Sequence, residues 1–144
     1  MKFEDIINEW KQDSHIDKTA LDDEALNIPK LHHKYYTMLI TEKSILRKLE
    51  AEYKVLELEK YEFYTMGHTE ETKAKGWRLP PKGMILKPDI PMYMKADQDL
   101  IDLALRIGVA QEKVDYLESI IKSFQTRGYN IKTALEFIKF TNGM

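Results

Sequence analysis

The sequence has no cysteine and no long apolar run, and these absences narrow what the protein can be. Without cysteine among its 144 residues, the chain has no disulfide, no thiolate nucleophile and no zinc–cysteine site. No stretch approaches the roughly 18 apolar residues of a membrane-spanning helix. The first residues, MKFEDI, are acidic, whereas a signal peptide begins with basic residues and an apolar segment. We therefore expect a cytoplasmic protein with one modest core.

Catalytic and metal-binding motifs are also scarce. There is no glycine-rich phosphate loop, no nucleophile elbow and no HExxH motif. The adjacent His32 and His33 would point about 100° apart on a helix, so they cannot chelate one ion. The aspartates of residues 97–102 lack the glycine and final glutamate of a calcium loop and suit the start of a helix. We predict no enzyme, no metal and no cofactor. The alternative left open is a metal-dependent hydrolase that uses Asp22, Asp23 and His32 or Asp97 and Asp99.

Proline and glycine are concentrated in one stretch. Four of the five prolines and three of the six glycines fall within residues 66–92, which predicts a long connection without helix. On either side, apolar residues recur at three- and four-residue steps. They predict a helix over residues 3–12, a long helix over 18–65 that Pro29 kinks or restarts, a second long helix ending at Gly128, and a short last helix.

The predicted fold is all-α, a long antiparallel helical hairpin with short N- and C-terminal helices. We assign residues 1–144 to a single helical domain, in which 1–65 hold the N-terminal and long helices, 66–96 the basic connection, and 97–144 the second long helix and the C-terminal helix. β-Hairpin signals are absent from the sequence.

The length of the predicted helices indicates self-association. A helix over residues 18–65 would be roughly 70 Å long, or about 55 Å if it restarts at Pro29, whereas a compact chain of this size is about 37 Å across. Uncovered apolar stripes normally mark an interface. We therefore expect a homo-oligomer, with a monomeric bundle that folds back at Pro29 as the alternative. The N-terminal helix should contribute its apolar face, namely Phe3, Ile6, Ile7 and Trp10.

Charge is spread unevenly along the chain. With 22 basic and 24 acidic residues the net charge is only −2, so any DNA binding must come from a local patch. The first 24 residues have a net charge of −5, whereas residues 73–95 have six basic residues against Asp89 alone, a net charge of +5. After Glu118 the net charge is +3.

Basic residues in and before the connection alternate with aromatic ones. Cations that follow phosphates, with rings on which bases stack at roughly 1–3 kcal/mol per base, are what sequence-tolerant binding of single-stranded DNA requires. A lysine-rich loop can also be merely solvated, so a non-enzymatic helical scaffold or adaptor without DNA binding is the alternative. The predicted DNA-binding residues are Lys54, Lys60, Tyr61, Tyr64, Lys73, Lys75, Trp77, Arg78, Lys82 and Lys87.

An ordered series of segments resembles the UvsY family of recombination mediators from T-even-type bacteriophages. The series comprises MKFEDI (1–6), IDKTAL (16–21), LEAEYKV (49–55), YEFYT (61–65), ADQD (96–99) and TRGYNIK (126–132). No single segment is diagnostic, but together they cover most of the chain in the family's order.

The resemblance implies a non-catalytic assembly protein in the cytoplasm of the infected bacterial host. Members of the family form ring-like homo-oligomers, bind single-stranded DNA, and contact the phage RecA-like recombinase and the phage single-strand-binding protein. Such a mediator would hold DNA in a form on which the recombinase can nucleate while the binding protein is displaced. No membrane partner is implied.

The resemblance also suggests roles for particular residues. Family members place DNA contacts on two basic positions near the end of the long helix; the second corresponds to Lys60, but the first is Leu58 here. The +5 connection could compensate for this departure. The family's tail helix is important for oligomerisation, and its apolar residues in this chain are Ile131, Leu135, Ile138 and Phe140.

Overall fold

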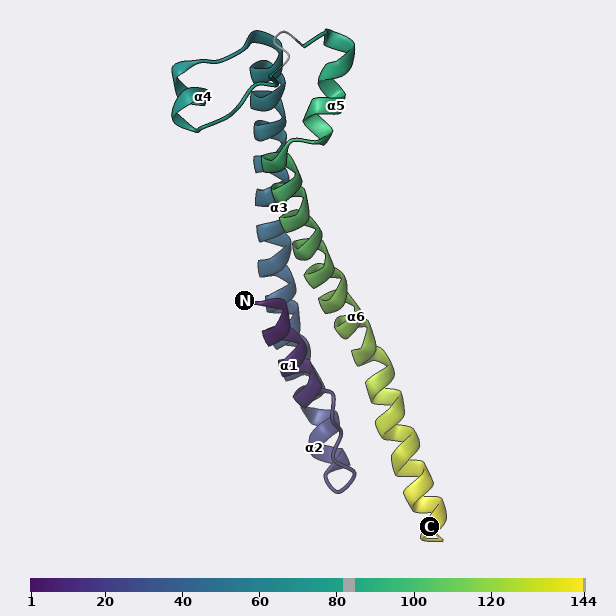
Figure 1. Ribbon diagram of the computed structural model, residues 1–144. Coiled ribbons are helices and arrows are strands. Elements are labelled where there is room, and N and C mark those ends of the chain that lie inside the picture. Colours follow the sequence, from purple (N-terminus) through teal and green to yellow (C-terminus); the bar gives the residue numbers. More distant parts are fainter. Residues whose placement is uncertain (82–84, 144) are drawn as a thin grey trace. The chain divides into compact units, whose positions relative to one another are not determined.

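The computed structural model describes residues 1–81 and 85–143, and every regular element in these ranges is a helix (Figure 1). The predicted all-α class is therefore confirmed. In the part of the chain that the structure describes, no helix has an apolar stretch long enough to cross a membrane. The elements are α1 (Phe3–Asp13), α2 (Leu21–Leu26), α3 (Ile28–Met66), α4 (Glu70–Ala74), the 3₁₀ helix η1 (Lys87–Asp89), α5 (Ile90–Lys95) and α6 (Gln98–Thr141).

The predicted restart at Pro29 is confirmed. α2 ends at Leu26, and α3 begins at Ile28, so that Pro29 lies in the first turn of α3. Proline is tolerated there because the first turn has no helical partner for its missing N–H. The long helix therefore begins about ten residues later than its apolar pattern suggested.

The predicted end of the second long helix at Gly128 is wrong, and so is the separate C-terminal helix. α6 runs without interruption from Gln98 to Thr141. A glycine inside a helix costs only about 1 kcal/mol relative to alanine. Ile131, one turn further on, is buried, and its packing keeps the backbone helical through Gly128.

The connection holds more helix than its prolines suggested. Thr69 and Thr72 form a reciprocal capping box at the start of α4, in which the Thr72 N–H donates to Thr69 Oγ1 at 3.3 Å and the Thr69 N–H donates to Thr72 Oγ1 at 2.8 Å. Pro88 and Pro91 lie in the first turns of η1 and α5. The prediction of a connection without helix was wrong because a capping box starts α4 and because proline is favoured in the first turn of a helix, as in η1 and α5.

Tertiary contacts divide the chain into two compact units. The first consists of Met1–Lys43 and Gln111–Met144, and the second of Ser44–Ala110. α3 and α6 each contribute a segment to both units. In each unit these segments run antiparallel (Figure 1), as the predicted hairpin requires. The assignment of the whole chain to one domain stays a prediction.

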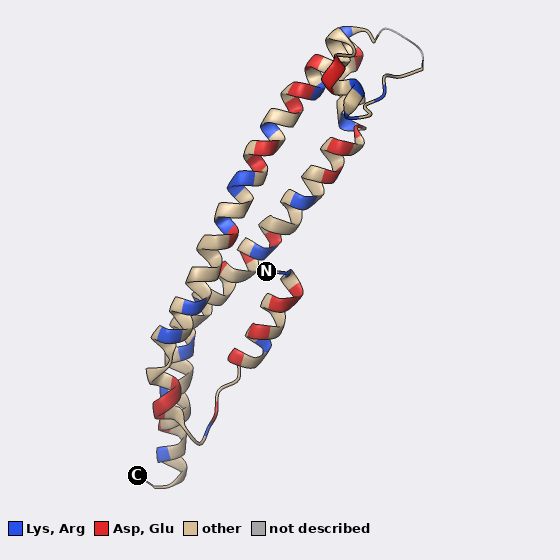
Figure 2. Ribbon diagram, turned by 90° about the vertical axis from the view of Figure 1, so that its left-hand side faces the viewer, with Lys and Arg blue, Asp and Glu red and all other residues tan. Residues whose placement is uncertain are grey.

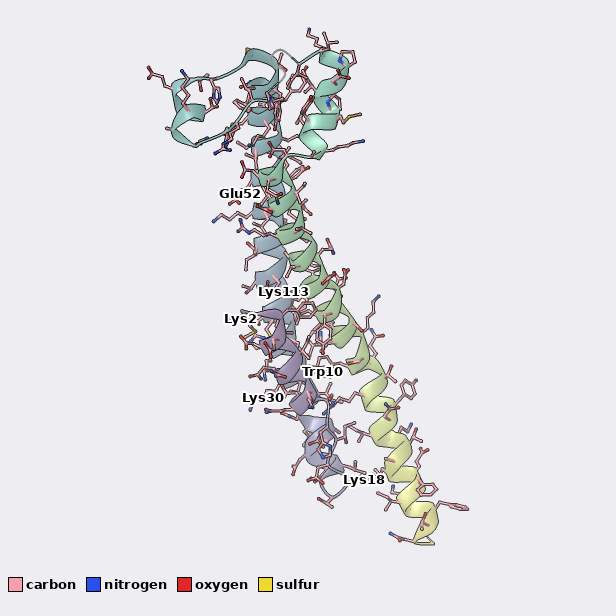
Figure 3. All side chains as sticks on the ribbon, viewed as in Figure 1. Lys2, Trp10, Lys18, Lys30, Glu52 and Lys113 are labelled. Atoms are coloured by element: carbon pink, nitrogen blue, oxygen red, sulfur yellow. The ribbon has the colours of Figure 1, made fainter. Side chains whose placement is uncertain are left out.

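The N-terminal helix packs inside the first unit. Trp10 points from α1 toward α6 (Figure 3), where its ring lies edge-on to Phe124, with 5.6 Å between the centroids. Phe3 makes a similar contact with Tyr116, also at 5.6 Å, and Ile6 is fully buried. Phe3 and Trp10 are half-buried by these contacts, so much of this face packs within its own chain, and its part in self-association stays a prediction. Ile7 remains 41% exposed.

The predicted oligomerisation residues at the end of α6 also include both buried and exposed side chains. Ile131 is only 5% exposed, so it packs in the core of the first unit. Leu135, Ile138 and Phe140 are exposed. These three side chains remain available to a second copy.

A buried arginine fixes the segment between α1 and α2 to α6. The Arg127 guanidinium is 6% exposed, donates to the carbonyl oxygens of Ser14 and His15 at 3.3 Å, and pairs with Glu24 at 3.1 Å. Buried charges of this kind persist only where they are paired and hydrogen-bonded. The acidic N-terminal segment, residues 1–24, is thus attached within one unit to the basic C-terminal segment that follows Glu118.

Candidate nucleic-acid interface

Nine of the ten predicted DNA-binding residues lie in the second unit, which spans residues 44–110, and the tenth, Lys82, lies outside the described residues. Figure 2 shows basic and acidic residues interspersed along this part of α3. The unit's apolar core is formed by Leu46, Leu49, Phe63, Ile90, Leu100, Leu103 and Ala110.

Most of the predicted cations are exposed. Lys54 on α3, Lys73 on α4, and Arg78 and Lys87 further along the connection all face solvent. Within residues 1–81 and 85–143, no ion pair involves any of these four. Tyr61 is 46% exposed. These side chains are available to phosphates and to a base.

Lys75 is exposed but engaged with its own chain. Its Nζ lies 3.5 Å from Glu59 Oε2 and 5.0 Å from the centroid of the Trp77 ring. Both side chains of the Lys75–Glu59 pair are more than two-fifths exposed, and an ion pair this open to solvent is weak. Lys75 can therefore exchange Glu59 for a phosphate at little cost.

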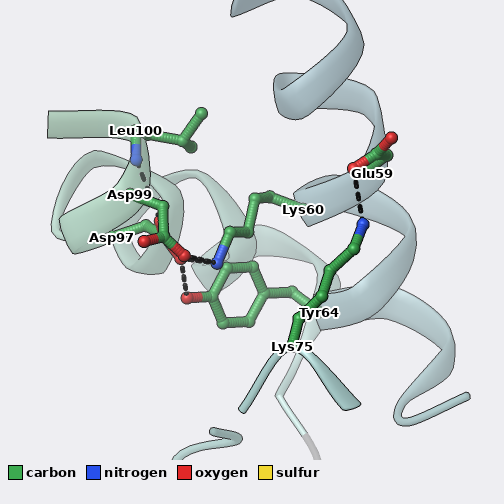
Figure 4. Close-up of polar contacts among 7 residues, drawn as sticks. All are labelled: Glu59, Lys60, Tyr64, Lys75, Asp97, Asp99 and Leu100. Atoms are coloured by element: carbon green, nitrogen blue, oxygen red, sulfur yellow. Dashed lines mark hydrogen bonds and ion pairs between the residues drawn. The ribbon is translucent and has the colours of Figure 1, made fainter. Parts of the chain in front are cut away.

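Lys60 is buried, unlike Lys54, Lys73, Arg78 and Lys87, and its role as a DNA contact stays a prediction. The residue is 3% exposed, and its Nζ lies 2.7 Å from Asp99 Oδ2 and 3.1 Å from Asp97 Oδ2 (Figure 4). Tyr64 is half-buried, and its hydroxyl donates to Asp97 Oδ2 at 2.6 Å. Lys60 and Tyr64 are thus held by the start of α6.

Trp77 joins the same cluster. The Lys60 Nζ lies 3.7 Å from the centroid of the Trp77 ring, and the Phe63 ring meets Trp77 edge-on at 5.3 Å. Trp77 is half-buried. Of the predicted aromatic residues, Tyr61 is therefore the one whose ring is most open to a stacking base.

Asp97 connects the cluster to the helix behind it. Its Oδ1 accepts the Leu100 N–H at 3.1 Å, so the prediction that these acids start a helix is confirmed. Within the described residues, no group of His, Asp and Glu side chains is arranged to hold a metal ion. Burial alone would raise the pKa of Asp97, but hydrogen bonds from Tyr64, the Leu100 N–H and Lys60 outweigh it and lower the pKa below 3.8.

We expect the second unit to lose stability in acid because of Asp97. A carboxyl whose pKa is lower in the folded state stabilises the fold above its unfolded pKa, and the contribution disappears as pH falls through the folded value. The thermal midpoint, followed by Trp77 fluorescence in a Trp10→Phe protein, should therefore fall below about pH 4. Asp97→Asn should be less stable at pH 7 but less sensitive to acid. The exposed Asp89→Asn is the control, and an Asp97→Asn protein with the original acid sensitivity would contradict this assignment.

Asp97 and Asp99 were not predicted as partners of Lys60, although the sequence carries a signal for such partners. Lys60 continues the three- and four-residue steps of the apolar stripe on α3, which places a cation on the core face. A cation there requires buried anions. The stripe itself cannot identify which carboxylates they are.

Fold and site together define the class of this protein. In its described residues it is an all-α protein with exposed cations and an exposed tyrosine on one unit, an arrangement typical of nucleic-acid binding. The chain belongs to the UvsY family, described as "Recombination, repair and ssDNA binding protein UvsY", whose model matches residues 9–144.

Similarity to individual proteins supports the same family assignment. The recombination protein uvsY of Enterobacteria phage T4 is 24% identical over 144 residues, and the match covers 99% of each chain. Two crystal structures of the bacteriophage T4 recombination mediator protein UvsY share the fold. Lattice type II has a TM-score of 0.79 at 24% identity and covers 99% of this chain and 98% of that one. Lattice type IV has a TM-score of 0.78 at 21% identity and covers 98% and 99%. The predicted resemblance is confirmed.

Proposed function

We propose that this protein is a recombination mediator that binds single-stranded DNA and promotes loading of a RecA-like recombinase while single-strand-binding protein is displaced. Its place of action would be the cytoplasm of the infected bacterial host. The proposal rests on one observation: exposed cations and an exposed tyrosine lie on one unit of a chain whose family is described as ssDNA binding.

The proposed mechanism needs no chemical step. A protein that binds one conformation of DNA better than others shifts the population toward it. A homo-oligomer would repeat the +5 segment of residues 73–95 around its axis, so that many weak contacts act together. A slightly acidic protomer could thus present a basic surface to DNA.

A salt titration tests the DNA contacts. Each phosphate neutralised on a single strand contributes about −0.7 to the slope of log K against log salt concentration. We expect Lys73→Met and Arg78→Met to weaken binding of a fluorescent oligonucleotide and to make this slope shallower by about that amount. Lys30→Met, which removes an exposed lysine of the first unit, is the matched control.

Two results would contradict the proposal. Unchanged affinity and slope in both variants would remove these residues from the DNA surface. No binding by the unaltered protein at any salt concentration would favour the scaffold alternative.

The mediator step needs its own measurement. On oligonucleotide coated with single-strand-binding protein, we expect the protein to shorten the lag before recombinase filaments assemble. An unchanged lag, with DNA binding intact, would limit the function to DNA binding.

A further inference from the structure

We propose that Lys60 is a positioning residue, whose ammonium holds Trp77 and the start of α6 against the end of α3 and thereby fixes where the basic residues of the connection emerge. Its effect on DNA binding would be indirect. The DNA part of this inference rests on the proposed function, whereas the positioning itself can be tested without DNA.

The charge of Lys60 is already neutralised. Its side chain is 4% exposed, that of Asp97 is 5% exposed, and a second carboxylate from Asp99 lies 2.7 Å from Nζ. A phosphate would have to displace these carboxylates to reach the buried ammonium. Asp97 is buried and Asp99 is 52% exposed, and two anions against one cation repel a further anion, so this ammonium is poorly placed to pair with a phosphate.

The same ammonium covers the indole of Trp77. A cation 3.7 Å from the ring centroid is within the distance of a strong cation–π contact, and tryptophan is the best ring for it. The edge-on ring of Phe63 supports the indole, with 5.3 Å between the centroids. The Trp77 side chain is thus held by α3 instead of by a base.

Trp77 in turn positions the cations next to it. Its backbone N–H donates to the Thr72 carbonyl at 3.2 Å, which closes the end of α4. Gly76, with φ of +75°, makes the left-handed turn between the end of α4 and Trp77. Lys73, Lys75 and Arg78 all lie within four residues of Trp77 and are exposed. Fixing Trp77 therefore pre-organises these side chains and reduces the entropy lost when they bind phosphates.

Trp77 fluorescence tests the positioning role directly. The chain has two tryptophans, so Trp10→Phe leaves Trp77 as the single reporter. In that background, Lys60→Met should increase quenching of Trp77 by acrylamide and shift its emission to the red. Lys60→Arg, which keeps a cation able to stack on a ring and pair with carboxylates, should restore both signals. The exposed Lys54→Met is the matched control and should change neither.

The salt slope separates positioning from contact. We expect Lys60→Met to weaken oligonucleotide binding about tenfold with an unchanged slope, whereas Lys73→Met makes the slope shallower by about 0.7. An unchanged Trp77 signal together with a shallower slope in Lys60→Met would overturn the proposal and make Lys60 a DNA contact. If the unaltered protein binds no DNA, the proposed function fails, and the quenching result alone decides the positioning role.

A second variant keeps the proposal falsifiable if Lys60→Met does not fold. Trp77→Phe removes the preferred ring while every charge stays in place. It should also weaken binding with the slope unchanged. Full affinity in Trp77→Phe would show that the positioning of the connection does not depend on this contact.

Discussion

Leu117→Ala should lower the free energy of unfolding of the first unit by about 2–5 kcal/mol. Leu117 lies on α6, where it is fully buried. The substitution removes the transfer free energy of the lost methyl groups and leaves a cavity that a helical core fills only partly. This effect is expected to be the largest of any single substitution discussed for stability.

The matched control is Leu26→Ala on α2, in the same unit. Leu26 is 80% exposed, so its truncation should change the stability by no more than about 0.5 kcal/mol. Urea titrations followed by Trp10 fluorescence in a Trp77→Phe protein measure both variants. Similar losses for the two variants would show that α6 does not use this face for its core.

The recurrence of apolar residues every three and four positions predicted the core faces of both long helices, because buried positions recur at the helical period. On α6 the predicted stripe includes Leu100, Leu103, Val114, Leu117 and Phe124, and all five are buried. The steps could not predict that α6 continues through Gly128. That continuation depends on packing around Ile131, which outweighs a local preference worth about 1 kcal/mol.

The exposed cations of the candidate site could be predicted from the sequence. Lys54, Lys73 and Arg78 face solvent, as charged residues usually do. The buried part was not predictable, because Lys60 meets carboxylates 37 and 39 residues further along the chain. Spacing reports the face of a helix, but it does not report which distant segment meets that face.

The end of α6 is the surface where a second copy could pack. Leu135 is 42% exposed, Ile138 37% and Phe140 80%. Leu135 and Ile138 also line an apolar groove of about 490 Å³ with Leu21 and Ala25 of α2. Exposed apolar side chains that line a groove favour an interface. Two residues of the predicted oligomerisation set, Leu135 and Ile138, thus line one groove.

Leu135→Ser combined with Phe140→Ser should dissociate the expected homo-oligomer and cost most of the apparent affinity for DNA. When several weak sites act on one strand, linkage raises the overall affinity by about 10²–10⁴ over a single site. We therefore expect the double variant to run near 17.0 kDa in light scattering, where the unaltered protein runs as a multiple of this mass. Its affinity for a long oligonucleotide should fall by about 10² or more, whereas binding of a short oligonucleotide that reaches one protomer should barely change.

Leu105→Ser is the control for this last experiment, because Leu105 is 65% exposed but belongs to the second unit. A double variant that keeps the mass of the unaltered protein would place the interface elsewhere. Dissociation with full affinity for long DNA would show that each protomer binds independently. The mediator mechanism would then lose the multivalency on which it depends, since one +5 segment on an acidic protomer makes only a few phosphate contacts.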